Sequence, residues 1–117
     1  ALVLSASEVI AMPGRVGLIS VDSFAAGKPI VTTMWPRHAP EFEYLTDGRT
    51  ALVTADSISQ YSGKLVQVLR ERATLASLQR EAWSESPRFS IEQMAENYSN
   101  GLLSWLRSPR ALKGALK

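Results

Sequence analysis

The chain contains no cysteine and only one histidine, His38, among its 117 residues. The lack of cysteine excludes disulfide bonds, thiol catalysis and cysteine-ligated zinc, and a single histidine excludes the usual histidine-based metal clusters. No apolar run approaches the ~20 residues of a membrane-spanning helix, and no basic segment precedes the apolar N-terminus as it would in a signal peptide. The net charge of +2 is too small to indicate a nucleic-acid partner. These absences favour a cytoplasmic protein.

The charge that is present is uneven, with a basic C-terminal end. The stretch from residue 107 onward has no acid and four basic side chains, at Arg107, Arg110, Lys113 and Lys117. Such an end is typical of a solvated tail, and the alternative is a weak attraction to anionic lipid at a membrane surface. We therefore predict one domain over residues 1–106 and a basic tail over residues 107–117. Because the chain starts without methionine inside an apolar segment, we expect it to be part of a larger protein.

Short apolar or β-branched runs alternate with helical patterns along the chain. The runs predict buried strands near residues 8–12, 30–33 and 50–53, and the helical patterns lie near residues 16–26, 41–45, 58–69, 75–82 and 91–106. Strands that alternate with helices and show no polar face indicate a parallel sheet. We predict an α/β fold with a partial Rossmann-like sheet of three strands and a helical C-terminal region. Further strands are expected upstream of Ala1.

Two glycines, Gly14 and Gly17, lie between the first predicted strand and the helix that follows it. In open parallel sheets, ligands bind beyond the carboxyl ends of the strands. The backbone N–H groups of Gly17, Leu18 and Ile19, together with the helix dipole, could hold a phosphate there. The alternative is an ordinary strand-to-helix turn. The spacing of the two glycines alone does not distinguish a phosphate site from such a turn. The loop has neither the GxGxxG pattern nor a Walker lysine.

An aspartate, Asp22, follows Gly17 by five residues in an otherwise apolar segment. We expect it to point inward, where an acid is costly to bury without a partner. A ribose diol would supply two hydroxyl donors to such a carboxylate. The alternative is a salt bridge to Arg15 or Lys28. Before any family is considered, the residues leave both explanations open.

The combined motifs resemble the C-terminal domain of retaining GT-B glycosyltransferases, the family called group 1 or family 4. The resemblance spans about residues 8–106 and is carried by Gly17-Leu18, Asp22, the segment 23–31 with Gly27 and Pro29, Pro40-Glu41, and the segment 47–53 with Asp47-Gly48 and Thr50. Members of this family bind a nucleoside-diphosphate sugar and transfer the sugar to an acceptor hydroxyl. The resemblance thus implies a donor-binding domain that needs no metal and no cofactor besides this substrate.

Roles follow from the resemblance residue by residue. Asp22 stands at the glutamate that holds the ribose, and the amides near Gly17, Leu18 and Ile19 stand where the family contacts the diphosphate or ribose. Two positions depart from the family pattern: Gly14 replaces the glutamate that contacts the donor sugar, and Asp22 is shorter than glutamate by one methylene. The arginine and lysine that clamp the phosphates in the family precede the segment present here. Arg15 is either a local substitute cation or an exposed loop residue.

His38 lies in the loop before Pro40, together with Trp35 and Arg37. It is interpreted either as a structural loop or cap residue or as a contact to donor or acceptor, because this loop is expected to face the same cleft as Gly14. No residue of the chain is assigned as a catalytic acid, base or nucleophile. No spacing around any serine suggests a hydrolase elbow.

Three functions remain open at the level of sequence. The first is the donor-binding portion of a retaining glycosyltransferase, inactive by itself because an N-terminal domain outside this chain would supply the acceptor site. The second is a sugar-nucleotide epimerase of the same architecture, and the third is a non-catalytic, glycosyltransferase-like binding subunit. The apolar face of the predicted helix 91–106 would normally cover another domain, so self-association is expected if that face is exposed.

Overall fold

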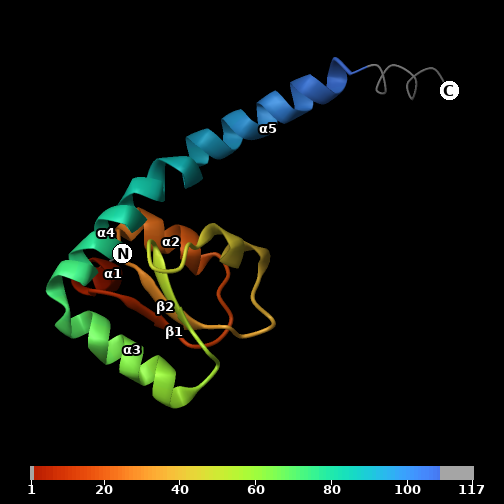
Figure 1. The fold of residues 1–117 in the computed structure, drawn as a ribbon. Coiled ribbons are helices and arrows are strands. Elements are labelled where there is room, and N and C mark those ends of the chain that lie inside the picture. The colour runs from red at the N-terminus through yellow and green to blue at the C-terminus, as the bar shows by residue number, and fades with distance from the viewer. Residues whose placement is uncertain (1, 109–117) are drawn as a thin grey trace. The chain divides into compact units, whose positions relative to one another are not determined.

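The computed structural model describes residues 2–108 and consists of short strands and helices in alternation (Figure 1). The elements are, in chain order, α1 (Leu2–Ala6), β1 (Ile10–Met12), α2 (Ile19–Ala26), β2 (Ile30–Thr33), the 3-10 helix η1 (Pro40–Tyr44), β3 (Ala51–Thr54), α3 (Ile58–Arg70), α4 (Arg72–Glu85), the 3-10 helix η2 (Ser86–Phe89) and α5 (Ile91–Leu106). Contacts divide the chain into two units, residues 1–86 and 87–117. The predicted basic tail lies outside the described residues from position 109.

The strands form a parallel sheet in the order β1-β2-β3, which confirms the predicted α/β fold with a three-stranded parallel sheet. Ile30 pairs with Ile10 on one side and with Ala51 on the other. All four residues of β2 are buried. A central strand of β-branched residues suits this position because helices cover both of its faces.

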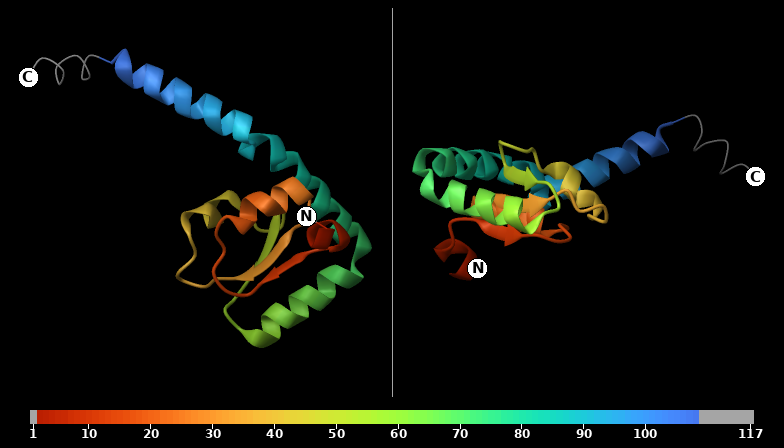
Figure 2. Two further views of the ribbon diagram at one scale, coloured as in Figure 1. Left: turned by 180° about the vertical axis from the view of Figure 1, so that it is seen from behind. Right: turned by 60° about the horizontal axis from the view of Figure 1, so that its bottom comes forward.

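Each face of the sheet has its own hydrophobic cluster. Ile30 packs with Ile10, Val16 and Ala51. The partly buried Ile19 of α2 and Phe42 of η1 pack against this cluster. The next residue, Val31, points to the opposite face and packs with Val68, Leu75 and Leu78 of α3 and α4. Successive strand residues face opposite sides, so β2 holds two helical layers together. Figure 2 shows the strands between α2 and α3.

Helix α2 ends as the sequence predicts but begins later. Gly27 has a φ of 62°, and the N–H groups of Gly27 and Lys28 donate to the carbonyls of Phe24 and Ser23, a glycine C-cap. The helix expected from residue 16 begins at Ile19. Val16 is fully buried in the loop before the helix. Val16 is apolar because it is buried by distant parts of the chain. The spacing of apolar residues does not distinguish such a loop residue from a residue of the helix.

Helix α5 belongs to the second unit and begins after a serine N-cap, Ser90. The N–H of Gln93 donates to the Ser90 hydroxyl over 3.1 Å. Its apolar side chains, among them Ile91, Met94 and Tyr98, are exposed, because residues 87–108 offer no second element long enough to cover them. None of the helices in residues 2–108 combines the length and the apolar character needed to cross a lipid bilayer.

Candidate functional site

The glycine loop between β1 and α2 is attached to the loop that follows β2. The Thr33 hydroxyl donates to the carbonyl of Pro13 over 2.8 Å. The N–H of Val16 donates to Nδ1 of His38 over 3.0 Å, and the carbonyl of Val16 accepts from the N–H of Ala39 over 2.9 Å. Bonds at both ends of the loop thus fix its path over the carboxyl ends of the strands.

His38 has both ring nitrogens occupied by the backbone. Nδ1 accepts from the N–H of Val16, and Nε2 lies 2.8 Å from the carbonyl oxygen of Thr33. A carbonyl only accepts and an amide N–H only donates, so the ring is neutral and carries its proton on Nε2. The ring also stacks on Phe42 at 4.0 Å between centroids. His38 therefore holds the glycine loop in place, and neither nitrogen is left for a ligand.

The three backbone amides predicted to hold a phosphate, those of Gly17, Leu18 and Ile19, lie at the start of α2. The first amide of the turn that donates to a backbone carbonyl is that of Ser20, to Gly17 over 3.0 Å, followed by Val21 to Leu18 over 2.9 Å. Within residues 2–108, the N–H groups of Gly17, Leu18 and Ile19 have no protein acceptor. Unpaired N–H groups at a helix start favour an anion. Leu18 is 69% exposed, so this corner of the helix faces solvent.

Asp22 differs from expectation in its burial. Its side chain is exposed, so the expectation that Asp22 points inward is wrong, and the cost of burying an acid does not apply to it. Neither Arg15 nor Lys28 pairs with it, and no hydrogen bond or ion pair reaches its carboxylate from any residue that the structure describes. The exposed face of α2 explains this: Leu18 and Asp22 are four residues apart and share it. An unpaired carboxylate at the surface remains available to a ligand.

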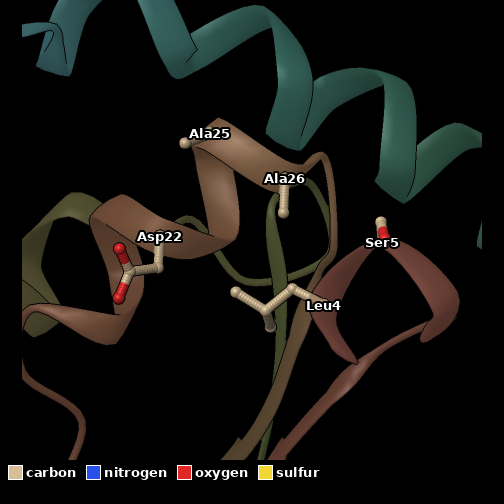
Figure 3. Close-up of a pocket in the computed structure, with 5 residues that line it drawn as sticks. All are labelled: Leu4, Ser5, Asp22, Ala25 and Ala26. Atoms are coloured by element: carbon tan, nitrogen blue, oxygen red, sulfur yellow. The ribbon is translucent and has the colours of Figure 1, made fainter. Parts of the chain in front are cut away.

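Asp22 lines a pocket of about 510 Å³ between α1 and α2 (Figure 3). Its other lining residues are Leu4, Ser5, Ala25 and Ala26. Figure 3 shows the methyl group of Ala26 directed toward Leu4, with the Asp22 carboxylate further along α2 toward its N-terminus. The volume falls in the range of ~300–1,000 Å³ typical of small-molecule sites. Apolar walls with one carboxylate and one hydroxyl suit a ligand that is itself partly apolar.

The other two predicted positions, Gly14 and Arg15, lie before this turn. A Cβ built on Gly14 would meet no atom within 4 Å, and its φ lies outside the left-handed region. Arg15 is exposed and forms no ion pair with a described residue. Both positions therefore face open space next to the amides of residues 17–19, and neither is required by the fold as the structure has it.

A second, smaller pocket of about 270 Å³ lies at the carboxyl ends of the strands, next to α3. It is lined by Pro13, Thr33, Asp56, Ser57, Ile58, Tyr61 and Ser62. The hydroxyl of Tyr61 is buried and has no hydrogen-bond partner within the described part of the chain. Burial raises the pKa of Tyr61 above its ordinary value of 10.0. The sequence indicated only an apolar helix position here, and no local pattern reveals whether a buried hydroxyl finds a partner.

The Asp47-Gly48 motif forms the turn before β3. The Asp47 carboxylate accepts from the N–H of Val53 over 2.8 Å, and Gly48 has a φ of 74°, where a side chain is disfavoured. Arg49 joins this turn to α4 through ion pairs to Glu81 at 2.7 Å and Glu85 at 3.2 Å. This part of the motif therefore stabilises the fold.

Among residues 2–108, no three histidine, aspartate or glutamate side chains gather closely enough to hold a metal ion. Comparison of the chain with family models, curated proteins and solved structures gives no match in any of the three. Assignment of a function therefore depends on the residues of the site itself.

Proposed function

We propose that this chain is the donor-binding portion of a retaining glycosyltransferase that uses a nucleoside-diphosphate sugar. One observation carries the proposal: Asp22, whose carboxylate is unpaired among the described residues, lines a pocket of about 510 Å³ one turn after three N–H groups that have no acceptor in this part of the chain. Amides at a helix N-terminus bind phosphate, and a carboxylate accepts hydrogen bonds from a ribose diol. The two features lie in the order in which a nucleotide presents these groups.

In this proposal the chain contributes electrostatic stabilisation to the transfer. The sugar–phosphate bond breaks and the diphosphate leaves with the electron pair, while the acceptor oxygen forms the new bond to the sugar and its proton passes to the departing diphosphate. The N–H groups of Gly17, Leu18 and Ile19 oppose the charge that develops on the departing diphosphate. In this proposal the acceptor site and the phosphate-clamping cations belong to parts of the protein outside this chain, so the isolated chain is expected to bind weakly and not to turn over.

One feature favours a second candidate, a glycosyltransferase-like binding subunit without catalysis. Gly14 stands where the resemblance places a sugar-contacting glutamate, and among the described residues a Cβ at this position would meet no atom within 4 Å. A site without this carboxylate would still bind the nucleotide. It would have one contact fewer for positioning the sugar.

The proposal is tested by titrating nucleoside diphosphates into the 15N-labelled chain and following amide shifts, which report weak binding. We expect shifts at the amides of residues 17–19. Replacement of Asp22→Ala should weaken binding about tenfold or more, because a hydrogen bond to a charged group is worth ~1.5–3 kcal/mol. Asp56→Ala, an exposed aspartate outside this pocket, is the matched control and should bind as wild type does.

Two results would contradict the proposal. If no nucleoside diphosphate binds to wild type at millimolar concentration, the site is not a nucleotide site. If Asp22→Ala binds as tightly as wild type, the carboxylate does not hold the ribose, and the proposed role of Asp22 is wrong.

A further inference from the structure

Helix α5 carries a stripe of large apolar side chains whose spacing is the same from either end. The stripe consists of Ile91, Met94, Tyr98, Leu102 and Trp105, at intervals of three, four, four and three residues. Spacings of three and four place side chains on one face of a helix. Each of the five is between 47% and 81% exposed. The α5 stripe is therefore an apolar surface that residues 2–108 leave uncovered.

The area of the α5 stripe is close to what a small interface requires. An aromatic side chain has ~150–250 Å² of surface, and the stripe contains two, Tyr98 and Trp105. Two such stripes packed together would bury on the order of 1,000 Å² in total, near the lower limit of specific protein–protein interfaces. The stripe thus suits a reversible association between two helices.

We infer that the same stripe of a second copy of this chain covers the α5 stripe, with the two helices antiparallel and centred on Tyr98. Because the spacing is symmetric, Ile91 then lies beside Trp105 of the second copy. Met94 lies beside Leu102 of the second copy, and the two Tyr98 rings meet at the centre, where aromatic pairs are favourable. Every apolar side chain of the stripe thus meets another. This inference does not depend on the proposed function.

Two small residues, Ala95 and Gly101, lie three positions before and three positions after Tyr98. Glycine is unfavourable inside a helix, and a Cβ at Gly101 would meet open space in the described chain. Packing within the chain therefore does not explain glycine at this position. Against a second helix, small residues on both sides of Tyr98 allow the backbones to approach and leave room for the tyrosine rings.

The charges along α5 favour the antiparallel orientation over a parallel one. Its acids, Glu92 and Glu96, lie in its first half, and the basic Arg107 directly follows its last residue. Three more basic residues and no acid follow up to residue 117. An antiparallel pair places the basic end of one copy beside the acidic half of the other and opposes the two helix dipoles. A parallel pair would place like charges side by side.

A membrane surface is the alternative partner for an exposed amphipathic helix. Helices that lie on membranes carry lysine and arginine on their polar face. Helix α5 has no basic residue between Ile91 and Leu106, and its two charged side chains are the acids Glu92 and Glu96. An anionic lipid surface repels such a face. The composition of α5 therefore favours a second copy over a membrane.

Sedimentation velocity of the 117-residue chain tests whether it pairs. We expect a shift from monomer to dimer between about 5 μM and about 500 μM, as for a small interface. Tyr98→Glu places two like charges at the centre of the pair and should weaken dimerisation about tenfold or more. Asn100→Glu is the matched control, because residues two positions apart lie on nearly opposite faces of a helix. This variant should dimerise as wild type does.

Engineered cysteines test the orientation, since the chain has none of its own. Met94→Cys and Leu102→Cys are prepared separately and oxidised mildly, alone and as a mixture. In the antiparallel pair the two copies of position 94 are ~12 Å apart along the axis, beyond the ~4 Å between the Cβ atoms of a disulfide. The mixture should therefore form a disulfide between the two variants about tenfold faster than either variant alone. Asn100→Cys is the control for random collisions.

Four results would overturn the inference. The first is a chain that stays monomeric throughout the concentration range, and the second is a folded Tyr98→Glu that dimerises as wild type does. The third is a disulfide that forms as fast in each single variant as in the mixture, which decides the matter if Tyr98→Glu fails to fold. The fourth is a monomer that binds vesicles of equal parts phosphatidylcholine and phosphatidylserine through Tyr98, which would assign the stripe to a membrane.

Discussion

Replacement of His38→Phe removes the two hydrogen bonds that hold the glycine loop while keeping an aromatic ring against Phe42. The ring stack has an interplanar angle of 5°, and a phenyl ring can occupy the same plane. The lost bonds are those from the Val16 N–H to Nδ1, at 3.0 Å, and from Nε2 to the Thr33 carbonyl, at 2.8 Å. The variant therefore isolates the contribution of the two nitrogens.

The magnitude follows from the burial of the groups left behind. Each bond contributes a net ~0.5–1.5 kcal/mol, and a buried donor left without a partner costs ~1–3 kcal/mol. Val16 has no exposed surface, so its N–H would become a buried donor without a partner. We expect His38→Phe to lower the free energy of unfolding by about 2–4 kcal/mol. Arg37→Ala, an exposed neighbour in the same loop, should change it by less than ~0.5 kcal/mol.

Urea unfolding followed by far-ultraviolet circular dichroism measures this difference, as a lower midpoint at an unchanged slope with denaturant concentration. A loss below ~0.5 kcal/mol would refute the reasoning, since the effect would equal that of an ordinary surface substitution. A variant with unchanged stability but weaker nucleoside diphosphate binding would point instead to His38 as a ligand contact. The two readouts together distinguish the structural role from the binding role that the sequence left open.

Two further predictions concern Tyr61 and Gly14. Tyr61→Phe should raise stability by about 1 kcal/mol, because it removes a buried hydroxyl without a partner, whereas the exposed Tyr98→Phe should have no effect. Burial raises the pKa of Tyr61, so the unfolded chain loses the hydroxyl proton first, near pH 10. The stability that this pKa difference contributes is fully present below about pH 10 and is lost as the pH rises further. Urea unfolding at about pH 8 and about pH 10.5 should therefore show a larger loss of stability for wild type than for Tyr61→Phe. Gly14→Glu should fold as wild type does because its Cβ meets open space, and it should strengthen binding of a nucleoside-diphosphate sugar relative to the diphosphate alone. An unchanged ratio of these two affinities would mean that position 14 does not approach the donor sugar.

The parts of the fold that depend on local chemistry were predictable. The β-branched run at residues 30–33 forms the central strand, and Gly27 ends α2 because only a residue without a Cβ adopts a positive φ cheaply. The start of α2 was not predictable in the same way. Val16 and Leu18 continue the apolar pattern of the helix, but Val16 is apolar because it packs against the sheet, and a contact between distant segments leaves no local pattern.

The order of the candidate site residues along α2 was predicted from the sequence, but their burial and their contacts were not. The amides of residues 17–19 stand at a helix start as expected. The density of apolar residues in α2 suggested a helix buried on most sides and hence an inward Asp22, yet one face of α2 is exposed because the described chain has nothing to cover it. The bond between Val16 and His38 joins residues 22 positions apart, which spacing alone cannot indicate.

Much of the resemblance to a glycosyltransferase domain is carried by residues whose contacts are structural. Gly27 caps α2, and Asp47 and Gly48 form the turn before β3. Any chain with these turns needs such residues, so similarity at these positions says little about a shared substrate. The functional argument therefore rests on the few residues that the fold does not use, the amides of residues 17–19 and Asp22, together with the pocket beside them. That is why a substitution at Asp22 tests the function more directly than substitutions at the motif glycines.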